Sequence, residues 1–337
     1  MKRFARTRQE EGGHQATPIG LVLSGGGAKG AYQAGVWMAL AERGLAERVK
    51  AISGTSVGAI NAAVFAAVRD PARIVAFWRS RVGGAVAERP EGLLSGDALA
   101  AWAERAVAGF ARGAGFPFPG ALDRSGLEQA LRDLLPERWP ESSPAVYATA
   151  LECVGGPWPA GRLERRVFRI DAEPDAERRR RMVLASSAIP FGLDPVEIDG
   201  AHFVDGGWEA MGGDNTPAAP ILENHPDIRT LVVVHLNAAA TAEGPWRRPT
   251  RLPALLGGVR YVEIRPSLPL PGLCDGLAQA LEFLPDDDLA REAAPLARFL
   301  RRTGGVFAFD PASAVRSLAL GRADALRILD DNQGAFR

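Results

Sequence analysis

The sequence is poor in cysteine and has no apolar run long enough to cross a bilayer. Cys153 and Cys274 are the only two cysteines among 337 residues, which argues against a disulfide framework or a cysteine zinc site and favours a reducing compartment. The longest apolar stretch, Val57 to Val68, is about half a membrane span and contains Asn61. The first residues are basic but lack the apolar region of a Sec-type signal peptide. The predicted location is therefore cytoplasmic, with peripheral contact at a membrane left open.

The chain also lacks an excess of charge of either sign. Forty basic residues balance forty acidic ones, which argues against a dedicated nucleic-acid surface. The content of 47% hydrophobic and 24% charged residues is typical of a globular enzyme and excludes a disordered chain. Residues 1–17 are interpreted as a flexible tail, and the remaining length is enough to bury a substantial core.

Short apolar strands alternate with helices in the first part of the chain. Residues 19–24 form a β-branched run that stops at a triple glycine, and helical spacing of apolar residues follows over 29–43. The same pair of patterns recurs as a strand at 49–53 and a helix at 57–69. This order predicts an α/β protein with a parallel sheet covered on both faces.

Further elements are expected along the remainder. Residues 73–144 predict a helical segment rich in aromatic residues, and a helix is expected over 174–187. Its run Arg178 to Arg181 is interpreted as a solvated, ion-paired face, with a lipid headgroup site as the alternative. Asp199-Gly200 predicts a hairpin turn. Strands are predicted at 146–151, 166–170, 230–236 and 261–264, and a last helix at 312–329.

Ser56 lies between two glycines where a strand gives way to a helix. The stretch Gly54-Thr55-Ser56-Val57-Gly58 fits G-x-S-x-G, the nucleophile-elbow pattern in which glycines allow a sharp turn that exposes a hydroxyl. The free N–H groups and the dipole of the following helix point at the same place. The alternative is a glycine-rich turn with a capping serine, so the pattern needs partners.

A second glycine-rich loop, Gly25-Gly26-Gly27-Ala28-Lys29-Gly30, precedes the first helix. It fits the dinucleotide pattern G-x-G-x-x-G, but the next strand ends in "AISG" without the carboxylate that would bind a ribose. It fails the P-loop pattern because Ala28 and Gly30 flank Lys29. Its bare backbone N–H groups can instead form an oxyanion hole, one βα unit from Ser56.

A nucleophilic serine needs a base, and the chain offers few histidines for this role. The four histidines are His14, His202, His225 and His235. His235 lies in an apolar strand and is interpreted as a core side chain. A carboxylate can take the proton directly if burial brings its pKa toward neutrality. Asp205, which two glycines follow, is the best-placed carboxylate, with an ordinary turn aspartate as the alternative.

Together these pieces resemble the patatin-like phospholipase family. The resemblance rests on "SGGGAKGAYQAGV" (24–36), "GTSVGAINAA" (54–63), "ASSAIPF" (185–191) and "IDGAHFVDGG" (198–207), and "LGRADAL" (320–326) resembles the family's last helix. The order and spacing agree over about residues 18–330. The resemblance implies one domain of that span with a three-layer α/β/α sandwich and a mainly parallel central sheet.

The resemblance also implies a Ser–Asp dyad, with Ser56 as nucleophile and Asp205 as base. It assigns the oxyanion hole to the glycine loop and the basic residue after it, and the elbow to the glycines beside Ser56. It implies no cofactor and no metal. The residues so assigned are Gly25, Gly26, Gly27 and Lys29 for the oxyanion hole and Gly54 and Gly58 for the elbow. The sequence departs from the family after the DGG motif, where Asn215-Thr216-Pro217 follows an additional "WEAMGGD".

The expected activity is hydrolysis of lipid or other acyl esters through an acyl-enzyme, as in a phospholipase A. A soluble esterase or thioesterase with the same dyad is the first alternative, and a nucleotide-binding module on Gly25–Gly30 is the second. Residues 267–303 are predicted to be a lid insertion that meets the lipid surface, with packing on the core as the alternative. The sequence leaves the headgroup, the acyl length, an activating partner and the oligomeric state open.

Overall fold

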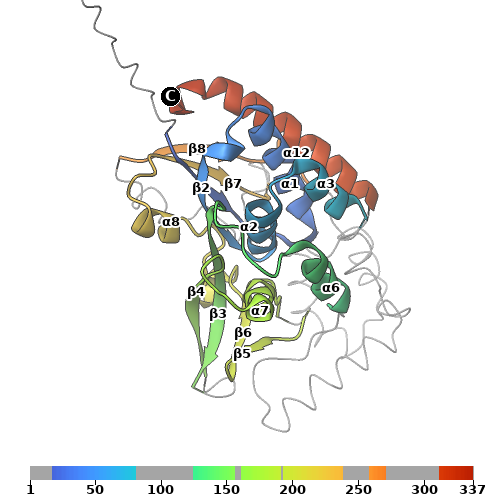
Figure 1. Cartoon of the computed structure of the whole chain (residues 1–337), viewed down its shortest axis with the longest axis vertical. Helices are drawn as coiled ribbons and strands as arrows, with labels where there is room; N and C mark the ends of the chain where they lie inside the picture. Colours follow the sequence, from blue (N-terminus) through green and yellow to red (C-terminus); the bar gives the residue numbers. More distant parts are fainter. Residues whose placement is uncertain are drawn as a thin grey trace, which may run out of the picture.

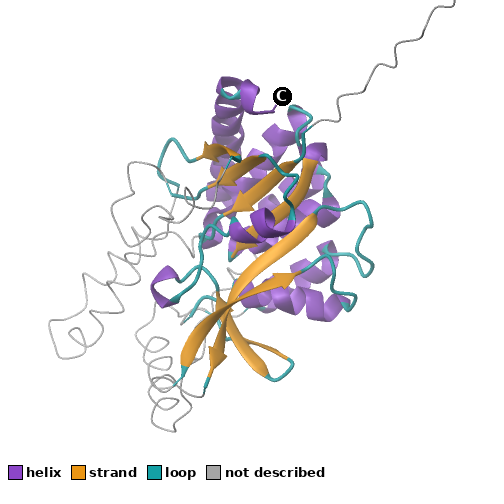
Figure 2. Ribbon diagram, turned by 90° about the vertical axis from the view of Figure 1, so that its left-hand side faces the viewer, coloured by secondary structure: helices purple, strands orange, loops and turns teal. Residues whose placement is uncertain are grey.

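A mixed sheet of eight strands runs through the centre of the computed structural model, which describes residues 17–80, 124–155, 161–190, 193–237, 258–270 and 311–336. The strands are ordered β5-β6-β3-β2-β1-β7-β8, and β4 pairs with β3 (Figures 1 and 2). Their bounds are β1 Ile19–Leu23, β2 Val49–Thr55, β3 Ala145–Val154, β4 Arg162–Arg169, β5 Val196–Ile198, β6 Ala201–Asp205, β7 Thr230–Val234 and β8 Arg260–Ile264.

The sheet is mainly parallel, as the sequence predicts. β1 pairs in parallel with β2 and β7, and the parallel arrangement continues from β2 to β3 and from β7 to β8. Antiparallel pairing is confined to the other end, where β3 pairs with β4 and β6, and β5 pairs with β6. The β5–β6 hairpin turns at Asp199 and Gly200, both with positive φ, which confirms the predicted Asp-Gly turn.

Helices cover both faces of this sheet and complete three layers. In Figure 1, α1, α2 and α12 lie on one face and the short α8 on the other. Alternate residues of β7 show the division, because Val232 and Val234 join the larger core cluster while Leu231 and Val233 join the smaller one under α8. The helical elements are η1 Gly27–Gly30, α1 Ala31–Glu42, η2 Ala46–Arg48, α2 Val57–Val68, α3 Pro71–Ser80, α6 Ser125–Leu134, α7 Ala176–Ser186, η3 Glu209–Met211, α8 Ala219–Asn224, α12 Pro311–Asp331 and η5 Gln333–Phe336.

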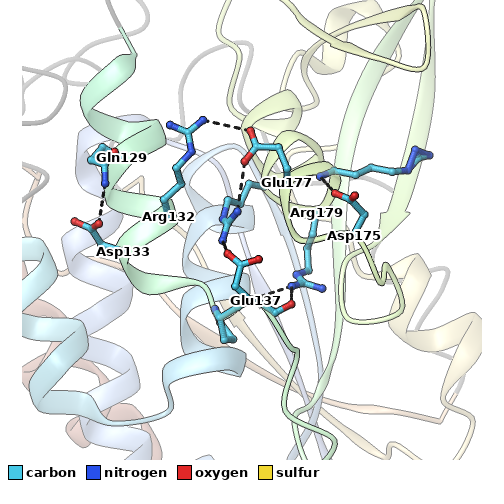
Figure 3. Close-up of polar contacts among 10 residues, drawn as sticks. Gln129, Arg132, Asp133, Glu137, Asp175, Glu177 and Arg179 are labelled. Carbon is cyan, nitrogen blue, oxygen red and sulfur yellow. Dashed lines mark hydrogen bonds and ion pairs between the residues drawn. The ribbon is translucent and has the colours of Figure 1, made fainter.

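In the run Arg178–Arg181 on α7, Arg178 and Arg180 form ion pairs, but two of the four side chains are not solvated. Arg179 is 1% exposed, and its guanidinium donates to three backbone carbonyls, including that of Glu137 at 2.9 Å (Figure 3). Arg180 is 7% exposed and pairs with Glu137 and Glu177. The expectation of a solvated face is therefore wrong for these two, which instead tie α7 to the chain that follows α6.

β3 and β4 are longer than predicted. β3 continues to Val154 and β4 begins at Arg162, and Arg166 pairs with Glu152 across the two strands and with Glu164 on its own strand. These additional strand residues are largely charged and do not alternate with apolar residues, so their sequence pattern does not predict a strand.

Several expectations fall on residues outside the described ranges. These include the tail, apart from residue 17, and residues 81–123 of the helical segment, whose described ends contain α3 and α6. Of the proposed lid, only residues 267–270 are described. Within the described ranges, no helix combines the length and the apolar character needed to span a membrane.

Candidate active site

The carboxyl ends of β2 and β6 meet on the same edge of β3. β2 runs parallel to β3 and ends with Thr55 opposite Thr149. β6 runs antiparallel to β3 and ends with Asp205 opposite Ala150, the next residue along. Since β4 pairs with both halves of β3 and occupies its other edge, β2 and β6 must follow one another along a single edge. Ser56, directly after β2, and Asp205 are thereby brought together.

Ser56 adopts a backbone conformation that few side chains tolerate. Its φ of 57° and ψ of −130° lie in a sparsely populated region, and such strain persists only when the surroundings enforce it. The neighbouring glycines provide the room for this turn. A Cβ on Gly54 would collide with the carbonyl of Gly58, and a Cβ on Gly58 with the carbonyl of Leu23. The turn between β2 and α2 therefore has the geometry of a nucleophile elbow.

The backbone of Ser56 is held by a serine to which sequence reasoning assigned no role. The N–H of Ser56 donates to Ser186 Oγ at 3.0 Å, and the Ser186 hydroxyl donates to the Thr149 carbonyl at 2.6 Å. Ser186 is the last residue of α7, and it links the elbow to β3. The only signal for it in the sequence was its place in the "ASSAIPF" stretch.

Asp205 is a buried carboxylate, and only one of its oxygens has a hydrogen bond of regular geometry. Its side chain accepts a hydrogen bond from Gly207 N–H at Oδ1, at 2.7 Å. Within the described structure, the buried Oδ2 has no hydrogen bond of regular geometry. The Ser56 hydroxyl and the Gly207 N–H lower the pKa of Asp205, but burial has the larger effect and raises this pKa to about 6.

The glycine loop passes directly beside Ser56, but its first amide is already in use. Gly25 N–H donates to Asn215 Oδ1 at 3.1 Å, and a Cβ on Gly25 would lie 2.9 Å from the Cβ of Ser56. The sequence prediction counted Gly25 as an oxyanion donor, and this structure gives that N–H to Asn215 instead. In the described part of the chain, the N–H groups of Gly26 and Gly27 have no acceptor.

The basic residue of the loop points toward the end of β7. Lys29 Nζ donates to Asn237 Oδ1 at 3.2 Å. This bond attaches η1 to the segment that follows β7, on the same carboxyl edge of the sheet as the elbow.

Asn215 reaches the glycine loop although ten positions separate it from Asp205 in the sequence. The intervening residues 208–214 contain η3 and fold back on themselves, with Asp214 N–H donating to the Gly206 carbonyl at 2.8 Å. The Thr55 hydroxyl donates to the Asp214 carbonyl at 2.7 Å. This connection therefore leaves Asn215 between the two halves of the site.

The three histidines in the described ranges are not part of the site around Ser56. His235 is buried, its Nε2 lies 2.9 Å from Glu263 Oε1, and burial lowers its pKa. His225 contacts the Tyr147 hydroxyl at 3.0 Å, and His202 is exposed on β6. None of the three hydrogen-bonds to Ser56 in the described ranges, and His14 lies outside them. Among the described residues there is also no group of three or more His, Cys, Asp or Glu side chains that could hold a metal ion.

Comparison with models of known protein families shows to which family this chain belongs. The model of the patatin-like phospholipase family matches residues 21–222, which contain the glycine loop, the elbow, Asp205 and Asn215. This chain belongs to the patatin-like phospholipase family. The resemblance seen in the sequence motifs is thereby confirmed, and so is the α/β/α architecture. No curated protein sequence matches the chain significantly.

Solved structures that resemble this patatin-like chain come from bacteria and from humans. VipD from Legionella pneumophila is 16% identical with a TM-score of 0.42, over 94% of this chain and 67% of that one. The type III effector ExoU of Pseudomonas aeruginosa is 17% identical with a TM-score of 0.41, over 94% and 53%. Human GIVD cytosolic phospholipase A2 is 11% identical with a TM-score of 0.45, over 95% and 60%. The chain thus spans from about half to two-thirds of their lengths.

Proposed function

We propose that this chain is a serine acyl hydrolase that cleaves lipid acyl esters through an acyl-enzyme, as a phospholipase A does. The observation that carries the proposal is Ser56 in its strained elbow beside a buried Asp205 whose pKa is raised to about 6. A base works best when its pKa lies near the working pH, and burial tunes a carboxylate in that direction. Family membership supports a lipid substrate and, with it, peripheral contact with a membrane.

The side chains of Ser56 and Asp205 are sufficient for the proton transfers of the proposed hydrolysis. Ser56 Oγ attacks the ester carbonyl carbon while its proton passes to Asp205 Oδ2, the buried oxygen without a regular partner. Collapse of the tetrahedral intermediate expels the alcohol, which takes the proton back from Asp205. Water then attacks the acyl-enzyme, Asp205 accepts a proton from it, and release of the fatty acid returns that proton to Ser56 Oγ.

The glycine loop would stabilise the negative charge that develops on the carbonyl oxygen. The N–H groups of Gly26 and Gly27 lie in the loop that passes beside Ser56 and have no acceptor among the described residues. Donors that are already in place at the oxyanion contribute more to catalysis than donors that must reorient. The N–H of Gly25 is excluded from this role in the present geometry, because Asn215 accepts it.

Two measurements test the proposed function. A fluorophosphonate probe should label the purified chain covalently, and phospholipid vesicles should release fatty acid that mass spectrometry identifies together with the lysolipid. A series of soluble esters of increasing acyl length separates a lipid hydrolase from a short-chain esterase or thioesterase with the same dyad. Failure to label with the probe, together with binding of a nucleotide, would favour a binding module on the glycine loop.

The pH dependence should report the ionisation of Asp205. Its carboxylate must be deprotonated to accept the Ser56 proton, and its pKa is about 6, so kcat/KM is expected to fall roughly tenfold per pH unit below that value and to level off above it. The measurement is kcat/KM for a soluble ester between about pH 4.5 and pH 8. Since His235 could also titrate in this range, the His235→Gln variant should show the same inflection. Loss of the inflection in that variant would assign it to the histidine.

Gly26→Ala should lower kcat by about 10²-fold, the typical cost of losing one oxyanion donor. The added methyl group would lie 2.8 Å from Leu236 Cδ1, so the loop must shift and carry its N–H away from Ser56. Steady-state kinetics with a soluble ester provide the measurement. Gly334→Ala is the matched control, because a Cβ there meets nothing within 4 Å. Unchanged esterase turnover with loss of nucleotide affinity in Gly26→Ala would instead support the binding-module alternative.

A further inference from the structure

Two fully buried amide side chains connect the glycine loop to the helices behind it. Gln33 on α1 and Asn61 on α2 are both 0% exposed, although each lies in a helix that is otherwise almost entirely apolar on its buried side. Asn61 Nδ2 donates to Gln33 Oε1 at 2.8 Å, and Asn61 Oδ1 accepts from Trp78 Nε1 at 3.0 Å. Such a polar group is tolerated in a core only when its partners are in place.

The two amides bond to the backbone at both ends of the loop. Gln33 Nε2 donates to the Ser24 carbonyl at 2.7 Å, where the loop begins. Asn61 Nδ2 donates to the Gly30 carbonyl at 2.9 Å, where the loop ends. Asn61 belongs to the same helix that Ser56 begins. One short network therefore connects the elbow helix to the complete span of the glycine loop.

The peptide unit between Ser24 and Gly25 is held from two opposite sides. Its carbonyl accepts from Gln33, and its N–H donates to Asn215 Oδ1 at 3.1 Å and to the Asn215 backbone carbonyl at 3.3 Å. Because a peptide unit is planar and rigid, fixing both its oxygen and its hydrogen fixes its rotation. The three glycines that follow have no side chains to restrict their φ and ψ. The bonds at the two ends of the loop, to the Ser24 and Gly30 carbonyls, therefore supply the restriction on where the N–H groups between them point.

We infer that Gln33 and Asn61 are positioning residues for the proposed hydrolysis. They touch neither the substrate nor Ser56, and they act by fixing the Ser24–Gly25 peptide and the end of the loop. This fixes the orientation in which the amides of Gly26 and Gly27 face the carbonyl oxygen under attack. The inference rests on the proposed function, and it predicts a loss in the chemical step that is separate from any loss of stability.

Gln33→Met tests this role, because methionine has a similar length and flexibility but donates no hydrogen bond. The variant should lose at least about tenfold in kcat and in the rate of labelling by a fluorophosphonate, since a displaced oxyanion donor costs this much or more. KM for a soluble ester should change by less than about threefold, because ground-state binding is not affected.

Tyr32→Phe is the matched control on the same helix. It removes another buried hydrogen bond, the one from the Tyr32 hydroxyl to Asp324 Oδ2 at 3.1 Å, on the side of α1 that packs against α12. Kinetics should be compared with the melting temperatures of both variants. Similar turnover of Gln33→Met and Tyr32→Phe at a similar melting temperature would show that the amide has a purely structural role and overturn the inference.

A second variant covers the case in which Gln33→Met does not fold. Asn215→Ala removes the shorter of the two bonds on the opposite side of the same peptide unit and leaves only the bond to the backbone carbonyl, and Asn215 is only partly buried. It should show the same loss in kcat with little change in KM, and in a folded double variant with Gln33→Met the two losses should be non-additive. Full turnover in Asn215→Ala would overturn the inference alone, whereas a wild-type chain that the phosphonate does not label would overturn the proposed function and the inference together.

Discussion

Ser56→Ala is expected to abolish ester turnover and covalent labelling by a fluorophosphonate. The substitution removes the one oxygen that is proposed to attack the carbonyl carbon and leaves the hydrogen bond from the Ser56 N–H to Ser186 Oγ unchanged. Alanine carries the same Cβ as serine, so it does not change the strain in the elbow. The fold should therefore survive, with a melting temperature within a few degrees of the wild type.

A second serine provides the control for this substitution. Ser143 donates its hydroxyl to the Ala66 carbonyl at 3.1 Å, far from the elbow in the chain, so Ser143→Ala should keep both turnover and labelling. Intact-mass spectrometry after exposure to the probe gives the answer in one measurement. A phosphonate adduct on the Ser56→Ala variant at the wild-type level would assign the nucleophile to another residue.

Asp205→Asn is expected to reduce kcat by about 10³-fold or more, in line with the loss of a member of a catalytic triad. The amide keeps the shape of the side chain and an oxygen for the hydrogen bond from Gly207 N–H, but it cannot accept the Ser56 proton. The comparison variant is His235→Gln, which should stay within about tenfold of the wild type because His235 pairs with Glu263. The opposite ranking of the two variants would indicate a Ser–His arrangement.

The Asp205→Asn substitution should also change the free energy of unfolding, by an amount that depends on pH. The pKa of Asp205 in the folded chain is about 6 and its ordinary value is 3.8, so folding favours the protonated form. The stability that this group contributes is complete below its ordinary pKa and is lost as the pH rises through about 6. Relative to the wild type, Asp205→Asn should therefore gain on the order of 2 kcal/mol between pH 4 and pH 8. Urea unfolding of both chains at the two pH values measures this, and a constant difference would contradict the raised pKa.

The pieces of the site could be predicted from the sequence because each depends on local geometry. The glycines around Ser56 and the Asp-Gly turn before β6 have signatures that span only a few residues. The predicted helix over 57–69 and the observed α2, Val57–Val68, agree within one residue. Local patterns also predicted the parallel strands, because buried strands are short, apolar and β-branched.

Contacts between distant segments could not be predicted in this way. Ser186 lies 130 positions from Ser56 and Asn215 lies 190 positions from Gly25, and nothing in either neighbourhood specifies the partner. The burial of Arg179 and Arg180 depends on the carbonyls of Pro136 and Glu137 and on the Glu137 carboxylate, which lie 42 or 43 positions away in the chain. Helical spacing shows which residues share a face but not what covers that face.

The end-to-end meeting of β2 and β6 along β3 determines where this chain can change in length during evolution. A one-residue insertion within Ala201–Asp205 would turn the Asp205 side chain to the opposite face of the sheet, and a two-residue insertion would move it by about 7 Å along β3. A shift of β3 could not compensate for either change, because β3 also sets the register of β2, the strand that precedes Ser56. Residues 208–213, by contrast, have only to bring Asp214 back to Thr55 and Asn215 back to Gly25. Variation in length among relatives should therefore accumulate after Asp205 and be absent from the strand before it.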